Sequence, residues 1–283
     1  MKKIKSITKP VMWTVTLLFA AVVAGCGGSG GGGSGSNLGA TGAACSGASC
    51  VDLGTAANYV ILDQATVTYT PTATVSSTPK VTGNTGISPA AASFITGFAL
   101  NLPAGGAYST STLVSGSVFA PGYANPTPAN LTTAIGDKNT AYTAAAGMAT
   151  AGGGLAGGAP GVACPGTGAL GGITLTPGVY TCTTTVSIGS GTAVTLSGAG
   201  VYVIKTTQGL TQAANTQVTL TNGAMPENVF WQVAGTVSID AGAHMEGVIL
   251  TASDVTLVTG ATVKGRLFGS TGVKMDSNTV TQP

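Results

Sequence analysis

Charge is scarce in this sequence. Asp, Glu, Lys and Arg together make up 6% of the 283 residues, the chain has one histidine, and Arg266 is its sole arginine. Four of the ten basic residues lie in the first nine positions, which leaves six bases against eight acids and a net charge of 6 − 8 = −2 for the remainder. A chain with so few basic residues has no extended positive surface, which excludes nucleic acid as a partner.

Groups for catalysis and metal binding are scarce as well. His244 stands between Ala243 and Met245, with Asp240 and Glu246 near it in sequence, and we interpret it as a solvated corner residue. No nucleophile elbow, zinc-protease motif or phosphate-binding loop is present. A β-helical lyase or hydrolase needs acidic and basic residues clustered in one groove, and this chain has few of either. The sequence therefore predicts no enzyme, no cofactor and no metal ion.

The N-terminus has the pattern of an export signal. Four lysines in residues 1–9 precede the apolar run Val11–Val23, and "VAGC" then ends at Cys26. This is similar to a bacterial lipobox, so we expect a lipoprotein signal peptide at 1–25 and lipidation of Cys26; a transmembrane anchor is the alternative. Residues 26–50 form a Gly/Ser-rich tether, and the folded domain is expected at 51–283. The expected location is outside the cytoplasm, on the outer membrane or cell surface, with the lipid anchor in the membrane.

The other four cysteines are even in number, which in an exported protein favours two disulfides. We expect pairs between Cys45 and Cys50 and between Cys164 and Cys182. A metal site is the alternative, but one histidine and the lack of a CxxC motif argue against it.

Glycine and small β-branched residues are abundant, and from Val179 they form repeats. Repeats begin at residues 179, 201, 229, 248 and 266, and the last three are 19, 18 and 18 residues long. That length suits one coil of three short strands joined by tight corners, so the sequence predicts an all-β parallel solenoid.

One segment reads as a helix, "TPANLTTAIGDKNTAYTAAAGM", at about 127–148. Thr127 suits the N-cap, Pro128 the first helical position, and Leu131 and Ile135 belong to an apolar stripe. The first strands of the repeats, such as "VYVIK" and "VFWQV", are apolar on both sides, so we expect the helix to cover them. Of Phe230 and Trp231, one is expected in the core and the other under the helix.

The second strands alternate between apolar and polar residues. Their apolar residues, such as Val255 and Leu257, are expected to point inward. Their polar residues are expected to form an outward column of Ser187, Thr211, Ser238, Thr256 and Lys274.

Several blocks resemble the bacterial and fungal ice-binding proteins of the DUF3494 type, among them "GNTGISPAAASFITGF" (83–98), "NVFWQV" (228–233), "TGATVKGR" (259–266) and "MDSNTV" (275–280). The resemblance runs from about Leu53 to the C-terminus. It implies a right-handed, discontinuous parallel β-solenoid of triangular cross-section with one long α-helix alongside. It also implies that the N-terminal strands join the stack beside the last coil. The implied activity is adsorption of a monomer to ice through a flat face, without a cofactor, giving thermal hysteresis and inhibition of ice recrystallisation.

The candidate ice-binding residues are Ser and Thr on outward strands and turns: Thr72, Thr74, Ser187, Thr211, Ser238, Thr256, Thr259 and Thr262. "TGAT" (259–262) resembles the T-A/G-x-T/N turn of active members, whereas "AGAH" (241–244) in the preceding repeat breaks it. Lys274 and Asp240 interrupt the columns, so we expect moderate activity.

Two other interpretations of the same surface stay open. Outward Thr and Ser suit any exposed strand, whatever its function. An adhesive or polysaccharide-binding solenoid without ice affinity is the alternative function; it predicts exposed aromatic residues or a Ca²⁺ site.

Overall fold

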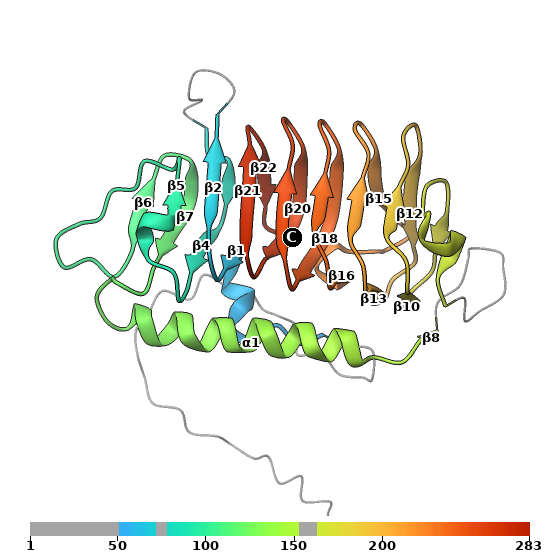
Figure 1. Cartoon of the computed structure of the whole chain (residues 1–283), viewed down its shortest axis with the longest axis horizontal. Coiled ribbons are helices and arrows are strands. Elements are labelled where there is room, and N and C mark those ends of the chain that lie inside the picture. Colours follow the sequence, from blue (N-terminus) through green and yellow to red (C-terminus); the bar gives the residue numbers. More distant parts are fainter. Residues whose placement is uncertain (1–50, 72–77, 153–162) are drawn as a thin grey trace, which may run out of the picture. The chain divides into compact units, whose positions relative to one another are not determined.

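Each repeat forms one coil of three strands, and the coils stack so that every strand pairs with its equivalent in the next coil. The computed structural model describes residues 51–71, 78–152 and 163–283, and Figure 1 shows these coils side by side with the helix along one side of the stack. The paired strands make three faces, which we name the helix face, the seven-strand face and the third face.

The helix face is the one on which the helix lies, and its strands are short and apolar. It consists of β10 (Gly178–Cys182), β13 (Tyr202–Thr206), β16 (Val229–Val233), the second halves of β18 (His244–Thr251) and β20 (Thr262–Phe268), β1 (Tyr59–Asp63) and β4 (Asn84–Ile87).

The seven-strand face is a separate parallel sheet. In spatial order it consists of β11 (Val186–Ile188), β14 (Leu210–Gln212), β17 (Val237–Ile239), β19 (Asp254–Leu257), β21 (Gly272–Asp276), β2 (Val67–Thr70) and β5 (Ile95–Thr96).

The third face completes each coil. It consists of β9 (Thr174–Leu175), β12 (Ala193–Ser197), β15 (Gln217–Thr221), the first halves of β18 and β20, β22 (Thr279–Thr281) and β3 (Val81–Thr82). β18 and β20 continue from the third face to the helix face at Gly247 and Gly265. A Cβ atom on Gly265 would lie 1.8 Å from the carbonyl oxygen of Gly247, so the corner requires glycine there.

The chain is discontinuous in the stack. β1, β2 and β3 pair in parallel with β20, β21 and β22 respectively, so the N-terminal strands lie directly beside the last coil. β7 (Val114–Phe119) follows β3 and β4, and β6 (Ser109–Ser111) pairs with it antiparallel at that end. At the opposite end, β8 (Ala151–Gly152) pairs antiparallel with β10. The predicted all-β, discontinuous solenoid is confirmed; its right-handedness stays a prediction.

The core has two parts because the helix-face strands are buried on both sides. Trp231 lies inside the coils with its indole nitrogen donating to the carbonyl oxygen of Glu246 at 2.9 Å, while Phe230 lies under the helix with Leu131. This confirms the expectation for the two aromatic residues.

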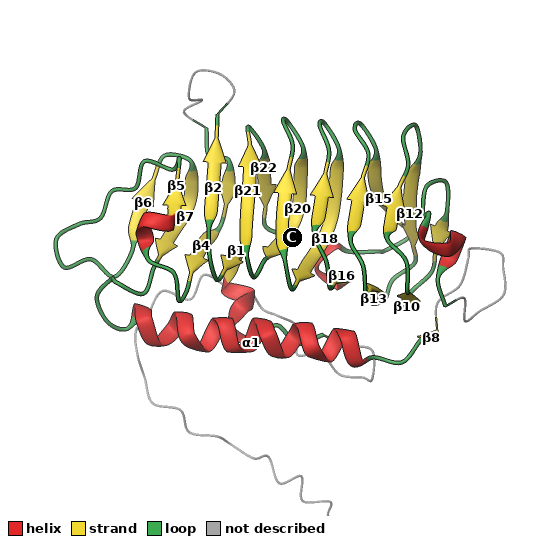
Figure 2. Ribbon diagram, viewed as in Figure 1, coloured by secondary structure: helices red, strands yellow, loops and turns green. Residues whose placement is uncertain are grey.

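Helix α1 (Thr127–Gly147) has the predicted extent (Figure 2), but its capping residue differs from the prediction. Thr127 is its first residue and not its N-cap, and the Thr127 hydroxyl donates to the carbonyl oxygen of Ala107. Pro126 occupies the cap position. Short 3-10 turns, η1 (Gly54–Asn58), η2 (Ala92–Phe94), η3 (Pro165–Gly168) and η4 (Pro226–Asn228), complete the structure. In the part that the structure describes, no helix is long and apolar enough to cross a membrane.

The expected disulfide between Cys164 and Cys182 is present and fastens the segment before η3 to β10. Cys26, Cys45 and Cys50 lie outside the described residues, as do the expected signal peptide and tether.

Candidate functional site

One column of side chains crosses the whole seven-strand face. Strand register places the outward residues of the seven strands directly beside one another, in the order Ser187, Thr211, Ser238, Thr256, Lys274, Thr68 and Thr96. Six of the seven carry a hydroxyl group. At a strand spacing of roughly 4.8 Å, the column extends over about 29 Å.

The column is held by the residues on either side of it in each strand, which point into the core. Val186 and Ile188 flank Ser187, and Val255 and Leu257 flank Thr256; each is at most 1% exposed. Because a side chain of a strand cannot turn to the other face without a shift of register, this buried pattern fixes the outward direction of the hydroxyl residues. The threonines add little flexibility, since a β-branched side chain has few rotamers about χ1.

The eight predicted residues do not all meet on this surface. Ser187, Thr211, Ser238 and Thr256 form the first four positions of the column. Thr259 lies at the corner beyond β19, where its hydroxyl donates to the carboxylate of Asp276. Thr262 lies on the third face, and Thr72 and Thr74 lie outside the described residues.

Two column residues, Thr68 and Thr96, were not predicted. The Thr96 hydroxyl donates to that of Thr68 at 3.2 Å, so these two positions form a continuous hydroxyl pair. The sequence signal was the alternation of "VTYT" (67–70), which matches that of "VTL" in β19. Thr68 and Thr96 extend the column onto the N-terminal coils.

Charged groups lie in and beside this column. Lys274 occupies the fifth position of the column, and its ammonium lies 3.0 Å from the carboxylate of Asp254. Asp240 follows β17, and its carboxylate accepts a hydrogen bond of 3.1 Å from Ser238. Lys274 thus takes a position in the column itself, whereas Asp240 lies beyond the end of β17 and accepts from a column residue.

The third face also carries threonines in register, but a polar network divides them. Thr174, Thr195 and Thr219 are adjacent on three strands, whereas Glu246 and Lys264 occupy the equivalent places on β18 and β20. These five residues form a mixed surface of hydroxyls and charges.

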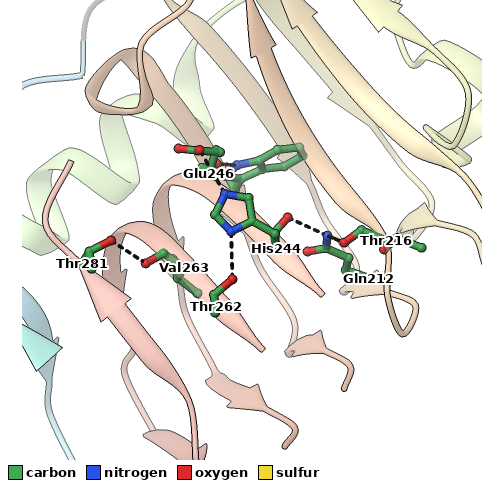
Figure 3. A network of polar contacts seen from close by, with 8 residues as sticks. Gln212, Thr216, His244, Glu246, Thr262, Val263 and Thr281 are labelled. Atoms are coloured by element: carbon green, nitrogen blue, oxygen red, sulfur yellow. Dashed lines mark hydrogen bonds and ion pairs between the residues drawn. The ribbon is translucent and has the colours of Figure 1, made fainter. Parts of the chain in front are cut away.

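His244 belongs to this network and does not form the solvated corner that the sequence suggested (Figure 3). Its Nδ1 lies 2.8 Å from the hydroxyl oxygen of Thr262, and its Nε2 lies 3.0 Å from a carboxylate oxygen of Glu246. In the same network, the buried Gln212 donates to the carbonyl oxygens of His244 and Thr216. The imidazole therefore connects neighbouring coils along the third face.

The described residues offer little to a metal ion or a large ligand. They contain no group of three or more His, Cys, Asp or Glu side chains close enough to hold a metal. A cavity of about 260 Å³ lies between α1 and the ends of β18 and β20, with Tyr142, Leu250 and Phe268 among its lining residues. Lys138 also lines it, but its ammonium already donates to Gln64, Gly269 and Ser270.

Known proteins resemble this chain in sequence. A model of the ice-binding-like family matches residues 61–281. Ice-binding protein K1-A of Typhula ishikariensis is 42% identical over 205 residues, which cover 72% of this chain and 78% of that protein. An ice-binding protein of Colwellia sp is 35% identical over 246 residues, covering 84% of this chain and 86% of the relative.

Solved structures give the same result. The antifreeze ice-binding protein LeIBP from an Arctic yeast aligns with a TM-score of 0.73 and 36% identity, covering 82% of this chain and 94% of that one. The DUF3494 domain of Shewanella frigidimarina ice-binding protein 1 aligns with a TM-score of 0.66 and 30% identity, covering 82% and 96%. The chain therefore belongs to the ice-binding-like family.

Proposed function

We propose that this protein binds ice through the seven-strand face. The observation that carries the proposal is the column of six hydroxyl side chains, in register on seven strands and directed outward by buried neighbours. Membership of the ice-binding-like family supports a binding function and not an enzymatic one.

The chemistry of the column suits an ordered layer of water. Each threonine presents a methyl group, which has no hydrogen bond to offer liquid water, beside a hydroxyl that can hold one water molecule in place. Because the backbone spaces these groups evenly and the side chains have few rotamers, little conformational entropy is lost when the water layer becomes ordered. A flat, evenly spaced surface can then share its water layer with an ice crystal.

The other faces are less suitable. α1 covers the helix face, and the third face has Glu246, Lys264 and the His244 network between its threonines. Charged groups bind water strongly in a geometry of their own. We therefore assign adsorption to the seven-strand face and expect moderate activity, since Lys274 and Asp254 also lie on it.

The test is ice growth in the presence of the chain from residue 26 onward, with Cys26→Ser so that no lipid is attached. We expect faceted crystals and thermal hysteresis, and a loss of most of the hysteresis on Thr256→Tyr, because the ring would lift the ice away from the neighbouring hydroxyls. Thr195→Tyr is the matched control, since Thr195 is the half-buried central residue of a third-face strand.

The outcomes separate the alternatives. Equal losses from Thr256→Tyr and Thr195→Tyr, with both variants folded, would remove the assignment to one face. Round crystals and no hysteresis for the parent protein would instead favour the adhesive or polysaccharide-binding solenoid.

We further propose that the protein acts as a monomer held to a membrane by a lipid on Cys26, at the outer membrane or cell surface. The basic start, the apolar run and "VAGC" support a signal peptide at 1–25. The Gly/Ser-rich composition of residues 26–50 supports a tether for the domain at 51–283. Fractionation of cells that express the full chain tests this: Cys26→Ser should move the protein out of the membrane fraction. A second disulfide between Cys45 and Cys50 belongs to the same proposal.

A further inference from the structure

Lys274 stands in the one position of the hydroxyl column that has no hydroxyl group. It lies between Thr256 and Thr68 in the register, with four hydroxyl residues on one side and two on the other. Its side chain is 58% exposed. With a hydroxyl residue at position 274, the column of hydroxyl groups would be continuous from β11 to β5.

The ammonium group of Lys274 has a carboxylate partner on the same face, Asp254. The carboxylate of Asp254 lies 3.0 Å from the ammonium nitrogen. Asp254 lies on β19 and is in register with Gly272 on β21, two residues before Lys274. The lysine side chain therefore crosses from β21 to β19, and Gly272 has no side chain that would block it. Burial alone would raise the pKa of Asp254, but the hydrogen bond and charge of Lys274 bring this pKa below its ordinary value.

The ion pair changes the water above it. An ammonium group is a compact, strongly hydrated charge on a flexible stem, and a carboxylate oxygen accepts several hydrogen bonds. Water around the pair is therefore oriented by the two charges and not by the spacing of the strands. A layer ordered by Thr256 on one side cannot continue across this water to Thr68 on the other.

We propose that the Lys274–Asp254 ion pair divides the adsorbing face into two separate parts, of which the four-residue part from Ser187 to Thr256 carries adsorption. Thr68 and Thr96 form the second part, which is too short to hold ordered water by itself. The pair thus determines how much of the solenoid contacts ice. This inference rests on the proposed ice binding by the seven-strand face.

The first experiment joins the two parts. Lys274→Thr with Asp254→Thr extends the hydroxyl column over all seven strands. Because the uninterrupted column lengthens from four residues to seven at the same strand spacing, we expect thermal hysteresis at equal concentration to rise about 1.5- to 2-fold. Lys274→Thr alone should give a smaller rise, since it leaves the Asp254 carboxylate without its partner. Lys264→Thr, which removes an exposed lysine from the third face, is the matched control and should have no effect.

The second experiment tests whether the parts are separate. In the parent protein, Thr68→Tyr should leave hysteresis nearly unchanged, because Thr68 lies beyond the ion pair. In the double variant, the same Thr68→Tyr should cancel the gain, because Thr68 is now part of one continuous column. Thermal unfolding of each variant shows that the fold is retained.

The results distinguish a failure of this inference from a failure of the proposed function. If Thr68→Tyr reduces the hysteresis of the parent protein as much as Thr256→Tyr does, the division of the column is wrong, but ice binding by this face still stands. The same conclusion follows from a double variant with unchanged hysteresis. A parent protein with no hysteresis would overturn the proposed function, and the division with it.

Discussion

Lys138 lies on the inner side of α1 with 2% of its surface exposed, where the helix pattern has an apolar position. Its ammonium donates to the side-chain oxygen of Gln64 at 2.9 Å, the carbonyl oxygen of Gly269 at 2.6 Å and the hydroxyl of Ser270 at 3.1 Å. Burial lowers the pKa of Lys138 to about 8, against the opposite effect of the nearby Asp63. The lysine thus connects the helix to a corner of the stack.

Asp63 is the anionic counterpart of this lysine. One of its carboxylate oxygens accepts from the backbone N–H groups of Ala65 and Thr66, while the other is buried without a hydrogen-bond partner among the described residues. Burial raises the pKa of Asp63, and the two backbone hydrogen bonds and the charge of Lys138 oppose the rise. Each of the two buried charges therefore depends on the other.

We expect Lys138→Met to lower the free energy of unfolding by about 2–4 kcal/mol, because Gln64, Gly269 and Ser270 lose a charged donor. The buried Asp63 carboxylate also loses the positive charge near it. Asp63→Asn keeps acceptors for Ala65 and Thr66, so the double variant should be less destabilised than the sum of the single variants by about 1–2 kcal/mol. Denaturant unfolding of the two single variants and the double variant measures this. Lys264→Met, at an exposed position, is the control; strictly additive losses would show that the two charges do not interact.

The helical spacing in the sequence places Lys138 on the buried side of α1, although the apolar stripe used for the prediction does not include it. Ala134, Lys138, Ala141 and Ala145 follow one another at helical spacing, so the lysine falls on the buried side of α1. Hydrophobic periodicity leaves such a residue out because it registers only the apolar members of a face. The partners of Lys138 are 74 to 132 residues away in sequence, and no local pattern could identify them.

At the scale of elements, the strands that repeat were predictable and those that do not repeat were not. β11, β17 and β19 each bury two alternating apolar residues, and the sequence shows that alternation directly. β14 buries Leu210 and the polar Gln212, so the apolar pattern alone did not identify both of its inward residues. The hairpin of β6 and β7 has no copy elsewhere in the chain, and its pairing was not predicted. Likewise the sequence suggested a turn at His244, where β18 in fact begins, because the partner that extends the strand is Thr262 in the next coil.

A disulfide bond links the first coil of the repeat region to the segment that precedes it. The Cys164–Cys182 disulfide closes a loop of 18 residues beside β10, and the segment that follows Cys164 covers the edge of β11, where the Leu170 N–H group donates to the carbonyl oxygen of Ser187 at 2.7 Å. An uncovered edge strand has unpaired backbone groups and is prone to fraying.

We expect the Cys164→Ala, Cys182→Ala double variant to lose about 3 kcal/mol of stability, the value for a loop of this length. Amide hydrogen exchange should accelerate in β10 and β11 more than in β20, because the loss is at one end of the stack. Hysteresis should fall only slightly, since Ser187 is the terminal member of the column. Uniform acceleration of exchange in all coils would show instead that the disulfide stabilises the solenoid as a whole.

At the scale of the whole molecule, the order of the chain and the order of the coils differ. A continuous solenoid begins and ends at the two ends of its stack, and its terminal coils can fray with little effect on the others. Here the C-terminal coil is interior: β20, β21 and β22 have coils on both sides, and the N-terminal strands pair with their outer edges. The C-terminus of this chain is thus a central part of the structure.

Truncation after Ser277 should therefore destabilise the protein far more than the loss of six terminal residues usually does. It removes β22, which lies between β20 and β3, together with Val280 and Asn278, both 0% exposed. The side-chain amide of Asn278 donates to the carbonyl oxygens of Val258 and Ala261, at 2.7 and 3.1 Å, and both hydrogen bonds would be lost. The Ala261 carbonyl oxygen would also lose the N–H group of Thr279. Burial of a valine and two such hydrogen bonds is worth several kcal/mol, so we expect the melting temperature to fall by at least about 10 °C.

Deletion of residues 282–283, which keeps β22, is the control and should have a small effect. A truncated chain that melts at the parent temperature would mean that the N-terminal coil pairs well enough without β22, and that the two segments of the stack are stable independently of each other.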